Sequence, residues 1–169
     1  MPVEEHRRES SRVEVKLCLL ITSNSIRMGL KKDVISPTVE RLCVEHGVPL
    51  VNRLVVPNDG EEIKKALTSL LSECNVILVT GGTGISPRDV SVESLRGYCV
   101  KDMPGFGELF RYLSFLKHGS AAMASRSFAC VVGSALIFVV PGSPDAVETA
   151  MSQLILPEAR HLLYELSKT

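Results

Sequence analysis

Continuous apolar runs along the chain alternate with segments in which apolar residues recur every three or four positions. Three runs rich in β-branched and aliphatic residues predict strands, namely VEVKLCLLIT, PLVNRLVV and NVILVT, at residues 13–22, 49–56 and 75–80. The third is uninterrupted, which is typical of a parallel strand covered on both faces. Strand and helix alternate along the chain, and this order predicts an α/β fold with a largely parallel sheet.

Two helices are predicted between these strands. Ser36 and Pro37 suit the cap and the first position of one helix, and Gly47 suits its end. Before the other helix, Asp59 is followed three residues later by Glu62, which resembles a capping box. The apolar residues that follow share helical spacing: Ile63, Ala66, Leu67, Leu70 and Leu71.

The C-terminal part adds a hairpin and a last helical region. FACVV and ALIFVV flank Gly133 and Ser134, a two-residue connection with glycine first, which predicts an antiparallel hairpin at one side of the sheet. Helical spacing follows PGSP, and Pro157 is expected to break or kink that helix. Together these elements predict a three-layer α/β/α single domain over residues 13–169, after a disordered polar tail over residues 1–12.

Composition narrows the classes of protein that the chain can belong to. The 169 residues include 19 Lys plus Arg and 19 Asp plus Glu, so nothing suggests a broad nucleic-acid-binding surface. The longest apolar runs are far shorter than a membrane span, and MPVEEHRRESSR is polar where a signal peptide needs an apolar core. We therefore expect a cytoplasmic protein with neither a membrane nor a nucleic acid as partner.

The cysteines and histidines show no spacing that suggests a metal site. The five cysteines are widely separated and include no C-x-x-C pair, so we expect buried side chains that act as small hydrophobes: Cys18, Cys43, Cys74, Cys99 and Cys130. The four histidines are expected at the surface or at helix ends: His6, His46, His118 and His161.

Three polar loops follow predicted strands, where ligands gather in folds of this class. They are TSNSIRMG after the first strand, TGGTGISPRD after the third and PGSPD after the last. A single glycine-rich loop is often only a tight turn. Three such loops at one edge of the sheet predict one shared binding site.

The glycines of the middle loop favour a close approach to an anion. Gly81, Gly82 and Gly84 can adopt positive φ and carry no Cβ, so successive N–H groups can converge on phosphate oxygens. The loop matches neither G-x-G-x-x-G nor G-x-x-x-x-G-K-[ST], so it is not predicted to be a dinucleotide-binding loop or a P-loop of the usual kind.

Polar side chains in and after this loop add to its chemistry. Thr83 and Ser86 supply hydroxyl donors, and Ser91 is expected to cap a helix whose dipole favours an anion nearby. Arg88 can hold an anion bidentately, and Asp89 can hold a hydrated Mg²⁺.

The segment TGGTGISPRDV resembles the T-G-G-T-G-x-x-x-R-D-V signature of the molybdopterin-binding family that includes Mog, MoaB and the G domain of gephyrin. MPGFGELFR, ASR and PGSP are similar to segments of that family and occur in the same order, so the resemblance covers most of residues 13–160. The run LSFLKHGSAAMASR is more similar to the MoaB branch than to the Mog branch.

The resemblance implies a molybdopterin adenylyltransferase, which uses Mg²⁺ and ATP to place AMP on the terminal phosphate of molybdopterin and releases pyrophosphate. Such a transfer needs two anionic groups held in line with their charge neutralised. Catalytic roles are implied for Asp59, Arg88 and Asp89, with Asp89 as the metal ligand. Contacts with the substrates are implied for Ser23, Gly81, Gly82, Thr83, Gly84, Ser86, Glu108, Ser125, Pro141, Gly142 and Ser143.

The resemblance also implies partners. Members of the family form trimers or hexamers, so a homo-oligomer is expected, and a molybdate-inserting protein is a further candidate partner beside molybdopterin and ATP.

Some segments depart from the family pattern. Asn24 stands where the family often has the aspartate of S-D-S, Asn58 stands where it has the aspartate of P-D-E, and residues 33–37 read D-V-I-S-P instead of D-x-S-G-P. Fewer acids could weaken metal binding. A non-catalytic molybdopterin- or nucleotide-binding scaffold or carrier of the same fold therefore stays open as an alternative, and an unrelated α/β phosphate-binding enzyme is a second one.

Overall fold

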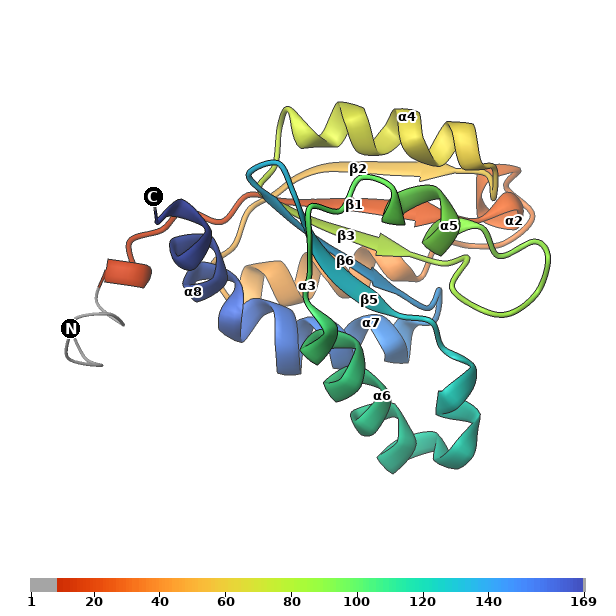
Figure 1. Ribbon diagram of the computed structural model, residues 1–169. Coiled ribbons are helices and arrows are strands. Elements are labelled where there is room, and N and C mark those ends of the chain that lie inside the picture. Colours follow the sequence, from red (N-terminus) through yellow and green to blue (C-terminus); the bar gives the residue numbers. More distant parts are fainter. Residues whose placement is uncertain (1–8, 169) are drawn as a thin grey trace.

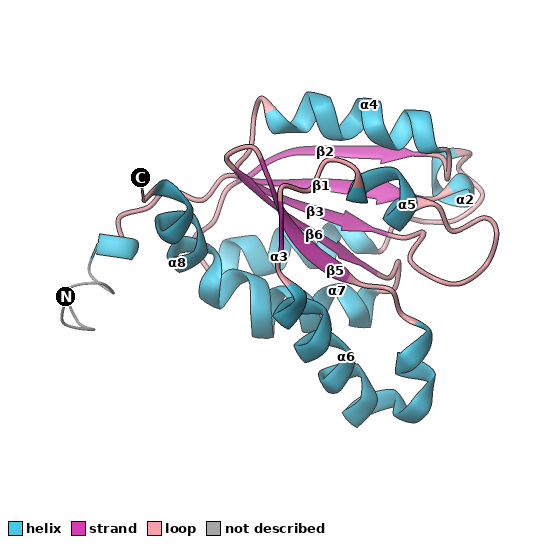
Figure 2. Ribbon diagram, viewed as in Figure 1, coloured by secondary structure: helices cyan, strands magenta, loops and turns pink. Residues whose placement is uncertain are grey.

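The computed structural model describes residues 9–168 and shows one six-stranded sheet between two layers of helices (Figures 1 and 2). The strand order is β2-β1-β3-β6-β5-β4. The predicted three-layer α/β/α architecture is thus confirmed. Among the described residues, no helix is both long enough and apolar enough to cross a bilayer.

The sheet is mostly parallel, as predicted. The neighbouring strands β2, β1, β3 and β6 pair in parallel, β5 pairs antiparallel with β6, and β4 pairs antiparallel with β5. The strands are β1 (Leu17–Thr22), β2 (Leu50–Val56), β3 (Val76–Thr80), β4 (Lys101–Asp102), β5 (Phe128–Val132) and β6 (Ala135–Val140). The hairpin between β5 and β6 is confirmed, and Gly133 in its turn has φ 58°. The short edge strand β4 was not predicted.

Helices cover both faces of the sheet. Side chains of α3, α6, α7 and α8 join one apolar core, and those of α4 and α5 join the core on the opposite face (Figure 1). The helices are α2 (Asn24–Arg27), α3 (Ile35–Glu45), α4 (Gly60–Leu71), α5 (Ser91–Arg96), α6 (Pro104–His118), α7 (Pro144–Ala150) and α8 (Leu156–Ser167), with a 3₁₀ turn η1 (Gly119–Ala124) and a π-helical turn η2 (Met151–Ile155).

The start of α3 differs from the prediction. Val34 occupies the cap position, and the capping hydrogen bonds come from Asp33 just before it, not from Ser36: the Asp33 Oδ1 atom accepts hydrogen bonds from the N–H groups of Ile35 and Ser36, both at 2.9 Å. Ser36 is buried within the helix and donates its hydroxyl to the same carboxylate. Partial burial opposes ionisation of Asp33, but the hydrogen bonds from Ser36 and Arg53 outweigh it and lower the pKa of Asp33.

We predict that Asp33→Ala destabilises the protein by about 1 kcal/mol, because α3 loses its cap. A carboxyl whose pKa is lowered by folding stabilises the protein above its unfolded-state pKa, and this stabilisation is lost as the pH falls through the lower folded-state pKa. The difference between wild type and variant in urea unfolding should therefore shrink in acid. Asp33→Asn, which can still cap, is the matched control. A difference that stays constant from neutral to strongly acidic pH would contradict this account.

The start of α4 agrees with the prediction in part. Asp59 caps it, accepting hydrogen bonds from the N–H groups of Glu61 at 3.0 Å and Glu62 at 3.1 Å. Glu62 does not complete the capping box, because its side chain pairs with Lys65. The predicted apolar face is buried at Ile63, Ala66, Leu67 and Leu70.

Both chain ends depart from expectation. The interruption predicted at Pro157 is a π-helical turn that joins α7 to α8, so the helical path continues. Residues 9–12 form a helical turn in which Ser10 is buried, and Tyr164 of α8 donates a hydrogen bond to Glu9. The last four residues of the predicted disordered tail are therefore ordered, and its residues 1–8 lie outside the described residues.

Four cysteines are paired, contrary to the prediction that all act as small hydrophobic side chains. Disulfides join Cys18 to Cys74 and Cys99 to Cys130, with Cα–Cα distances of 5.9 and 5.7 Å. The paired cysteines are 56 and 31 residues apart in the sequence, so their spacing alone does not predict the pairs. Cys43 is free and buried, as predicted, and burial raises its pKa to about 11. Because disulfides persist mainly in oxidising surroundings, the cytoplasmic location stays a prediction.

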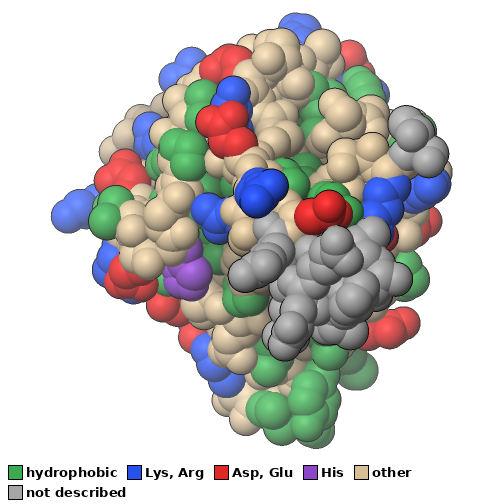
Figure 3. All heavy atoms as spheres, turned by 90° about the vertical axis from the view of Figure 1, so that its left-hand side faces the viewer, with side chains coloured by type: hydrophobic (Ala, Val, Ile, Leu, Met, Phe, Trp, Pro, Cys, Tyr) green, Lys and Arg blue, Asp and Glu red, His purple; other side chains and the backbone are tan. Residues whose placement is uncertain are grey.

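The outer face of α6 and η1 is unusually apolar. Large hydrophobic side chains are more than half exposed at Leu109, Tyr112, Phe115, Leu116 and Met123. Figure 3 shows hydrophobic side chains gathered at the lower tip of the molecule, where α6 ends, whereas acidic and basic side chains are interspersed over the rest of that face. We call these five residues the α6 apolar surface.

Candidate functional site

The loop between β3 and α5 depends on two glycines. Gly81 has φ 102° and Gly82 has φ 65°, both in the region that side chains with a Cβ rarely adopt. A Cβ on Gly81 would lie 2.3 Å from the carbonyl oxygen of Thr22, and one on Gly82 would lie 2.4 Å from Ser91 Oγ. The predicted need for glycine is thus confirmed at both positions.

The third glycine of the loop, Gly84, is needed for space and not for its backbone conformation. Gly84 does not have a positive φ, so that part of the prediction is wrong. A Cβ on Gly84 would lie 2.7 Å from Asp89 Oδ2. The same oxygen accepts a hydrogen bond from the N–H of Ser86 at 3.1 Å, and the N–H of Asp89 donates to the Ser86 carbonyl oxygen at 2.9 Å. Asp89 therefore closes the loop on itself, and its carboxylate has no second hydrogen-bond partner among residues 9–168.

Ser91 does not cap α5 as predicted. It is the first residue of that helix and is fully buried, and Val90 occupies the cap position without a side-chain hydrogen bond. The Ser91 hydroxyl lies 3.2 Å from the Thr22 hydroxyl, and its N–H donates to the Gly82 carbonyl oxygen at 3.1 Å. Ser91 thus ties the loop to the end of β1.

The loop after β6 packs against this glycine loop. The N–H of Gly81 donates to the Val140 carbonyl oxygen at 3.0 Å, and the Thr80 hydroxyl donates to the Pro141 carbonyl oxygen at 2.9 Å. A Cβ on Gly142 would approach Gly81 Cα to 3.2 Å. The two loops thus meet at the carboxyl edge of the sheet, where the sequence placed them.

The loops after β1 and β2 are joined through the two asparagines that depart from the family pattern. The N–H of Asn58 donates to Asn24 Oδ1 at 2.8 Å. The Asn58 Oδ1 atom is buried and has no hydrogen-bond partner in the described part of the chain. Ser23 caps α2 by accepting a hydrogen bond from the N–H of Ile26 at 3.2 Å. Asp59 caps α4, so both of these predicted site residues also support local structure.

Arg126 is a site residue that the sequence did not identify, although ASR was recognised as a motif. Its guanidinium donates to the carbonyl oxygens of Gly84 at 2.9 Å and Asp89 at 3.3 Å. Its backbone N–H donates to the carbonyl oxygen of Thr83 at 3.1 Å. It also pairs with Glu93, and this hydrogen bond lowers the pKa of the Glu93 carboxyl. Arg126 thus holds the loop through three of its carbonyl oxygens.

Three hollows adjoin this edge, and the segment 125–127 borders all of them. The loop hollow, of about 400 Å³, is lined by Ser86, Asp89, Glu93 and Arg126 among others. The α6 hollow, also of about 400 Å³, is lined by Glu108, Arg111, Arg126 and Ser127 among others. The serine hollow, of about 210 Å³, is lined by Ser125, Pro141 and Ser143 among others. Six of the predicted site residues line these hollows: Ser86 and Asp89 the first, Glu108 the second, and Ser125, Pro141 and Ser143 the third. They are therefore divided among three adjoining hollows and do not share one.

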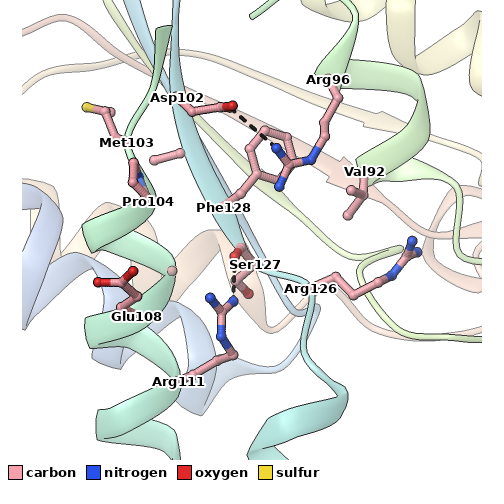
Figure 4. Close-up of a pocket in the computed structure, with 12 residues that line it drawn as sticks. Val92, Arg96, Asp102, Met103, Pro104, Glu108, Arg111, Arg126, Ser127 and Phe128 are labelled. Carbon is pink, nitrogen blue, oxygen red and sulfur yellow. Dashed lines mark hydrogen bonds and ion pairs between the residues drawn. The ribbon is translucent and has the colours of Figure 1, made fainter.

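The α6 hollow is lined by Glu108 and three arginines, with Glu108 and Arg111 on α6 and Arg96 and Arg126 across the hollow from Glu108 (Figure 4). The guanidinium of Arg96 lies 4.5 Å from the centre of the Phe128 ring and 3.4 Å from Asp102. Arg111 donates to the Ser127 carbonyl oxygen at 2.8 Å. Within residues 9–168, the side chains of Glu108 and Arg111 form no ion pair, so no described partner neutralises the charge of either group, although Arg111 already donates to the Ser127 carbonyl oxygen.

Charged groups near the glycine loop could hold an anion or a cation. Arg88 is exposed and forms no ion pair with any described residue, so its charge is free to attract phosphate. No group of three or more His, Cys, Asp or Glu side chains is arranged to hold a metal in the described chain. A magnesium ion at Asp89 would therefore need water and ligand oxygens for most of its coordination, as is usual for Mg²⁺.

The chain matches a family model over residues 18–161. That family is described as a probable molybdopterin-binding domain. The match spans every strand, apart from Leu17 at the start of β1, and every predicted site residue.

Individual relatives point the same way. A Staphylococcus carnosus protein named molybdenum cofactor biosynthesis protein B is 39% identical, over 95% of this chain and 99% of its own length. A Bacillus cereus protein of the same name is 36% identical, over 99% of each chain. Among solved structures, a tungsten cofactor synthesizing protein MoaB from Pyrococcus furiosus is 28% identical, with a TM-score of 0.85 over 92% of this chain and 98% of that one.

Proposed function

This chain belongs to the family of probable molybdopterin-binding domains, and we propose that it acts in molybdenum cofactor biosynthesis by transferring AMP from Mg-ATP to the terminal phosphate of molybdopterin. Pyrophosphate would be released. Its relatives' names support the pathway and its motif supports the reaction. The cofactor is Mg²⁺, and ATP is the co-substrate.

The observation that carries the proposal is the glycine loop between β3 and α5. Gly81 and Gly82 hold backbone conformations that a residue with a Cβ rarely adopts, and the N–H groups of Gly82 and Gly84 donate to no described residue. Arg88, in the same loop, has no ion-pair partner among the described residues. Nucleotidyl transfer depends mainly on positioning and on charge neutralisation. A loop that Arg126 holds through the carbonyl oxygens of Gly84 and Asp89, and that carries the unpaired guanidinium of Arg88, is suited to both tasks.

The residues present fit a magnesium ion that arrives with the nucleotide. Asp89 gives one oxygen to the N–H of Ser86, which leaves its Oδ1 atom for a cation. One carboxylate with phosphate oxygens and water is a normal ligand set for Mg²⁺. The ion would supply charge neutralisation at the phosphates, and Asp89 would hold it against the loop.

A non-catalytic scaffold or carrier is the second candidate, and the pair Asn24 and Asn58 favours it. Both positions carry amides where the resemblance leads us to expect carboxylates, and Asn58 Oδ1 is buried without a partner among the described residues. Such a site would bind molybdopterin or nucleotide yet neutralise the phosphates of ATP poorly. Binding without turnover is the result that this candidate predicts.

The decisive experiment incubates the protein with molybdopterin, Mg²⁺ and ATP and looks for adenylated pterin by mass spectrometry, together with released pyrophosphate. The proposed function predicts both products. Pterin binding without either product would support the scaffold, and no binding of pterin or ATP would contradict both candidates.

We also predict a homo-oligomer with a multiple of three subunits. The α6 apolar surface (Leu109, Tyr112, Phe115, Leu116 and Met123) gathers five large, exposed hydrophobic side chains on one part of the molecule, and an exposed apolar patch often marks an association surface, which supports an oligomer (Figure 3). Sedimentation velocity over a range of protein concentrations measures the subunit number. A monomer that persists at every concentration would contradict the prediction.

A further inference from the structure

One histidine that the proposed function does not use lies in the same hollow as three predicted ligand residues. His118, the last residue of α6, lines the serine hollow together with Ser125, Pro141 and Ser143. Its side chain is 55% exposed, so a ligand in the hollow could reach it.

Asp145 fixes the orientation of the His118 ring. The His118 Nε2 atom lies 2.9 Å from Asp145 Oδ2, and Lys117 Nζ lies 2.9 Å from Asp145 Oδ1 and 2.7 Å from the Thr149 hydroxyl. The hydrogen bond from Lys117, followed by that from His118, lowers the pKa of the Asp145 carboxyl. An ionised Asp145 accepts the hydrogen on Nε2, which leaves the Nδ1 atom of His118 for another partner. No described residue bonds to Nδ1.

The walls of the serine hollow suit a flat ring better than a phosphate. Most of the accessible surface is apolar, contributed by Phe110, Ala121, Ala122, Pro141 and Ala146. An apolar cleft with a few placed polar groups is typical of a site for a small organic molecule.

The polar groups of the hollow match the edge of a nitrogen heterocycle. Ser143 Oγ accepts a hydrogen bond from the N–H of Ala146 at 3.2 Å, and its own hydroxyl hydrogen stays free to donate. Ser125 Oγ lies 2.8 Å from Ser127 Oγ. With Nε2–H given to Asp145, the Nδ1 atom of a neutral His118 is an acceptor for an N–H or NH₂ group.

We propose that the serine hollow takes the planar heterocycle of a bound ligand and that His118 contacts the amide or amine edge of this ring. The proposal rests on the proposed function, which brings two rings with this chemistry to the protein, the pterin of molybdopterin and the adenine of ATP. Asp145 is then a positioning residue that orients His118, and the phosphates lie outside this hollow.

Direct titration of wild type and His118→Ala with three probes tests the proposal. The probes are 6-hydroxymethylpterin, adenosine and inorganic tripolyphosphate, so that each ring is measured without phosphate and the phosphates without a ring. The chain contains no tryptophan, so pterin fluorescence can be followed without interference from tryptophan. We expect His118→Ala to weaken one of the two heterocycles about tenfold and to leave tripolyphosphate unchanged. The weakened heterocycle identifies the ring that occupies the hollow.

Two further variants separate ligand contact from a structural role. Lys117→Met removes the other cation at Asp145 but does not line the hollow, so it should change ring binding far less than His118→Ala does. His118→Gln, which keeps an acceptor, should recover part of the affinity. Unchanged binding of both rings by His118→Ala, or an equal loss for tripolyphosphate, would overturn the proposal.

These results are distinguishable from failure of the proposed function. A wild type that binds 6-hydroxymethylpterin through His118 but makes no adenylated pterin would refute the transferase and support this inference. A wild type that makes adenylated pterin while His118→Ala binds both rings normally would do the reverse.

Discussion

Gly82→Val should abolish binding of molybdopterin, measured by titration of the purified protein. Valine at φ 65° is strained, because β-branched residues rarely adopt positive φ. Its Cβ would also lie 2.4 Å from the Oγ atom of the buried Ser91. The variant must therefore move either the loop or the start of α5, and in both cases the N–H groups of the loop lose their arrangement around an anion.

The same contacts predict a cost in stability beside the loss of binding. Ser91 ties the loop to Thr22 at the end of β1, so displacing it disturbs a buried hydrogen bond as well as the loop. Gly47→Val is the matched control, because Gly47 has a similar φ of 61° but nothing lies within 4 Å of the Cβ it would gain. The control should lower the free energy of unfolding through strain alone, by about 1–3 kcal/mol, and should still bind molybdopterin. Normal binding by Gly82→Val would show that the loop is not the anion site.

Local patterns predicted the features of this protein that local physics determines. The continuous apolar runs predicted strands β1, β2, β3, β5 and β6, and the helical spacing of apolar residues after Asp59 predicted α4 with its cap. Each of these patterns lies within a single element. Gly133 was placed correctly, since a two-residue turn with glycine first has few alternatives.

The features that sequence reasoning missed all depend on contacts between distant segments. Cys18 pairs with Cys74 because β1 and β3 are neighbours in the sheet, which the spacing of the cysteines does not reveal. Arg126 reaches Gly84 across 42 residues. Ser91 is a residue type that often caps helices, but its hydroxyl forms a hydrogen bond with the Thr22 hydroxyl at the end of β1.

The division of the site into three hollows also follows from tertiary packing. Sequence order placed Glu108 and Ser143 with the glycine loop, because each belongs to a recognised motif. Packing of α6 beside the edge of β5 puts Glu108 on one side of the segment 125–127 and Ser143 on the other. The close approach at Gly107, where a Cβ would lie 2.7 Å from the Ser127 carbonyl oxygen, fixes that packing.

Asp89→Asn should reduce adenylyl transfer about a hundredfold or more, roughly 3 kcal/mol of transition-state stabilisation. The amide oxygen of asparagine can still accept the hydrogen bond that the Ser86 N–H gives to Asp89 Oδ2, so the loop should keep its closed form. What the substitution removes is the negative charge that a hard cation requires. Affinity for the pterin should change little, because that ring does not depend on the metal. The measurements are pterin titration and the rate of pyrophosphate release, for wild type and variant under the same conditions.

Glu45→Gln is the matched control for this substitution, because it removes one negative charge at the end of α3, where Glu45 pairs with Arg41. Its rate should equal that of the wild type. Equal rates for Asp89→Asn and wild type would remove Asp89 from the mechanism, whereas a loss of pterin affinity as large as the loss of rate would mean that the carboxylate supports the loop and not the metal.

If the wild type itself binds pterin but releases no pyrophosphate, the scaffold is favoured, and the variant to make is Asn24→Asp with Asn58→Asp. Since Asn58 Oδ1 is buried without a partner among the described residues, a carboxylate there would be costly unless a cation met it. Turnover that appears only in this double variant, and only with Mg²⁺ present, would show that the two amides are the reason for the missing activity.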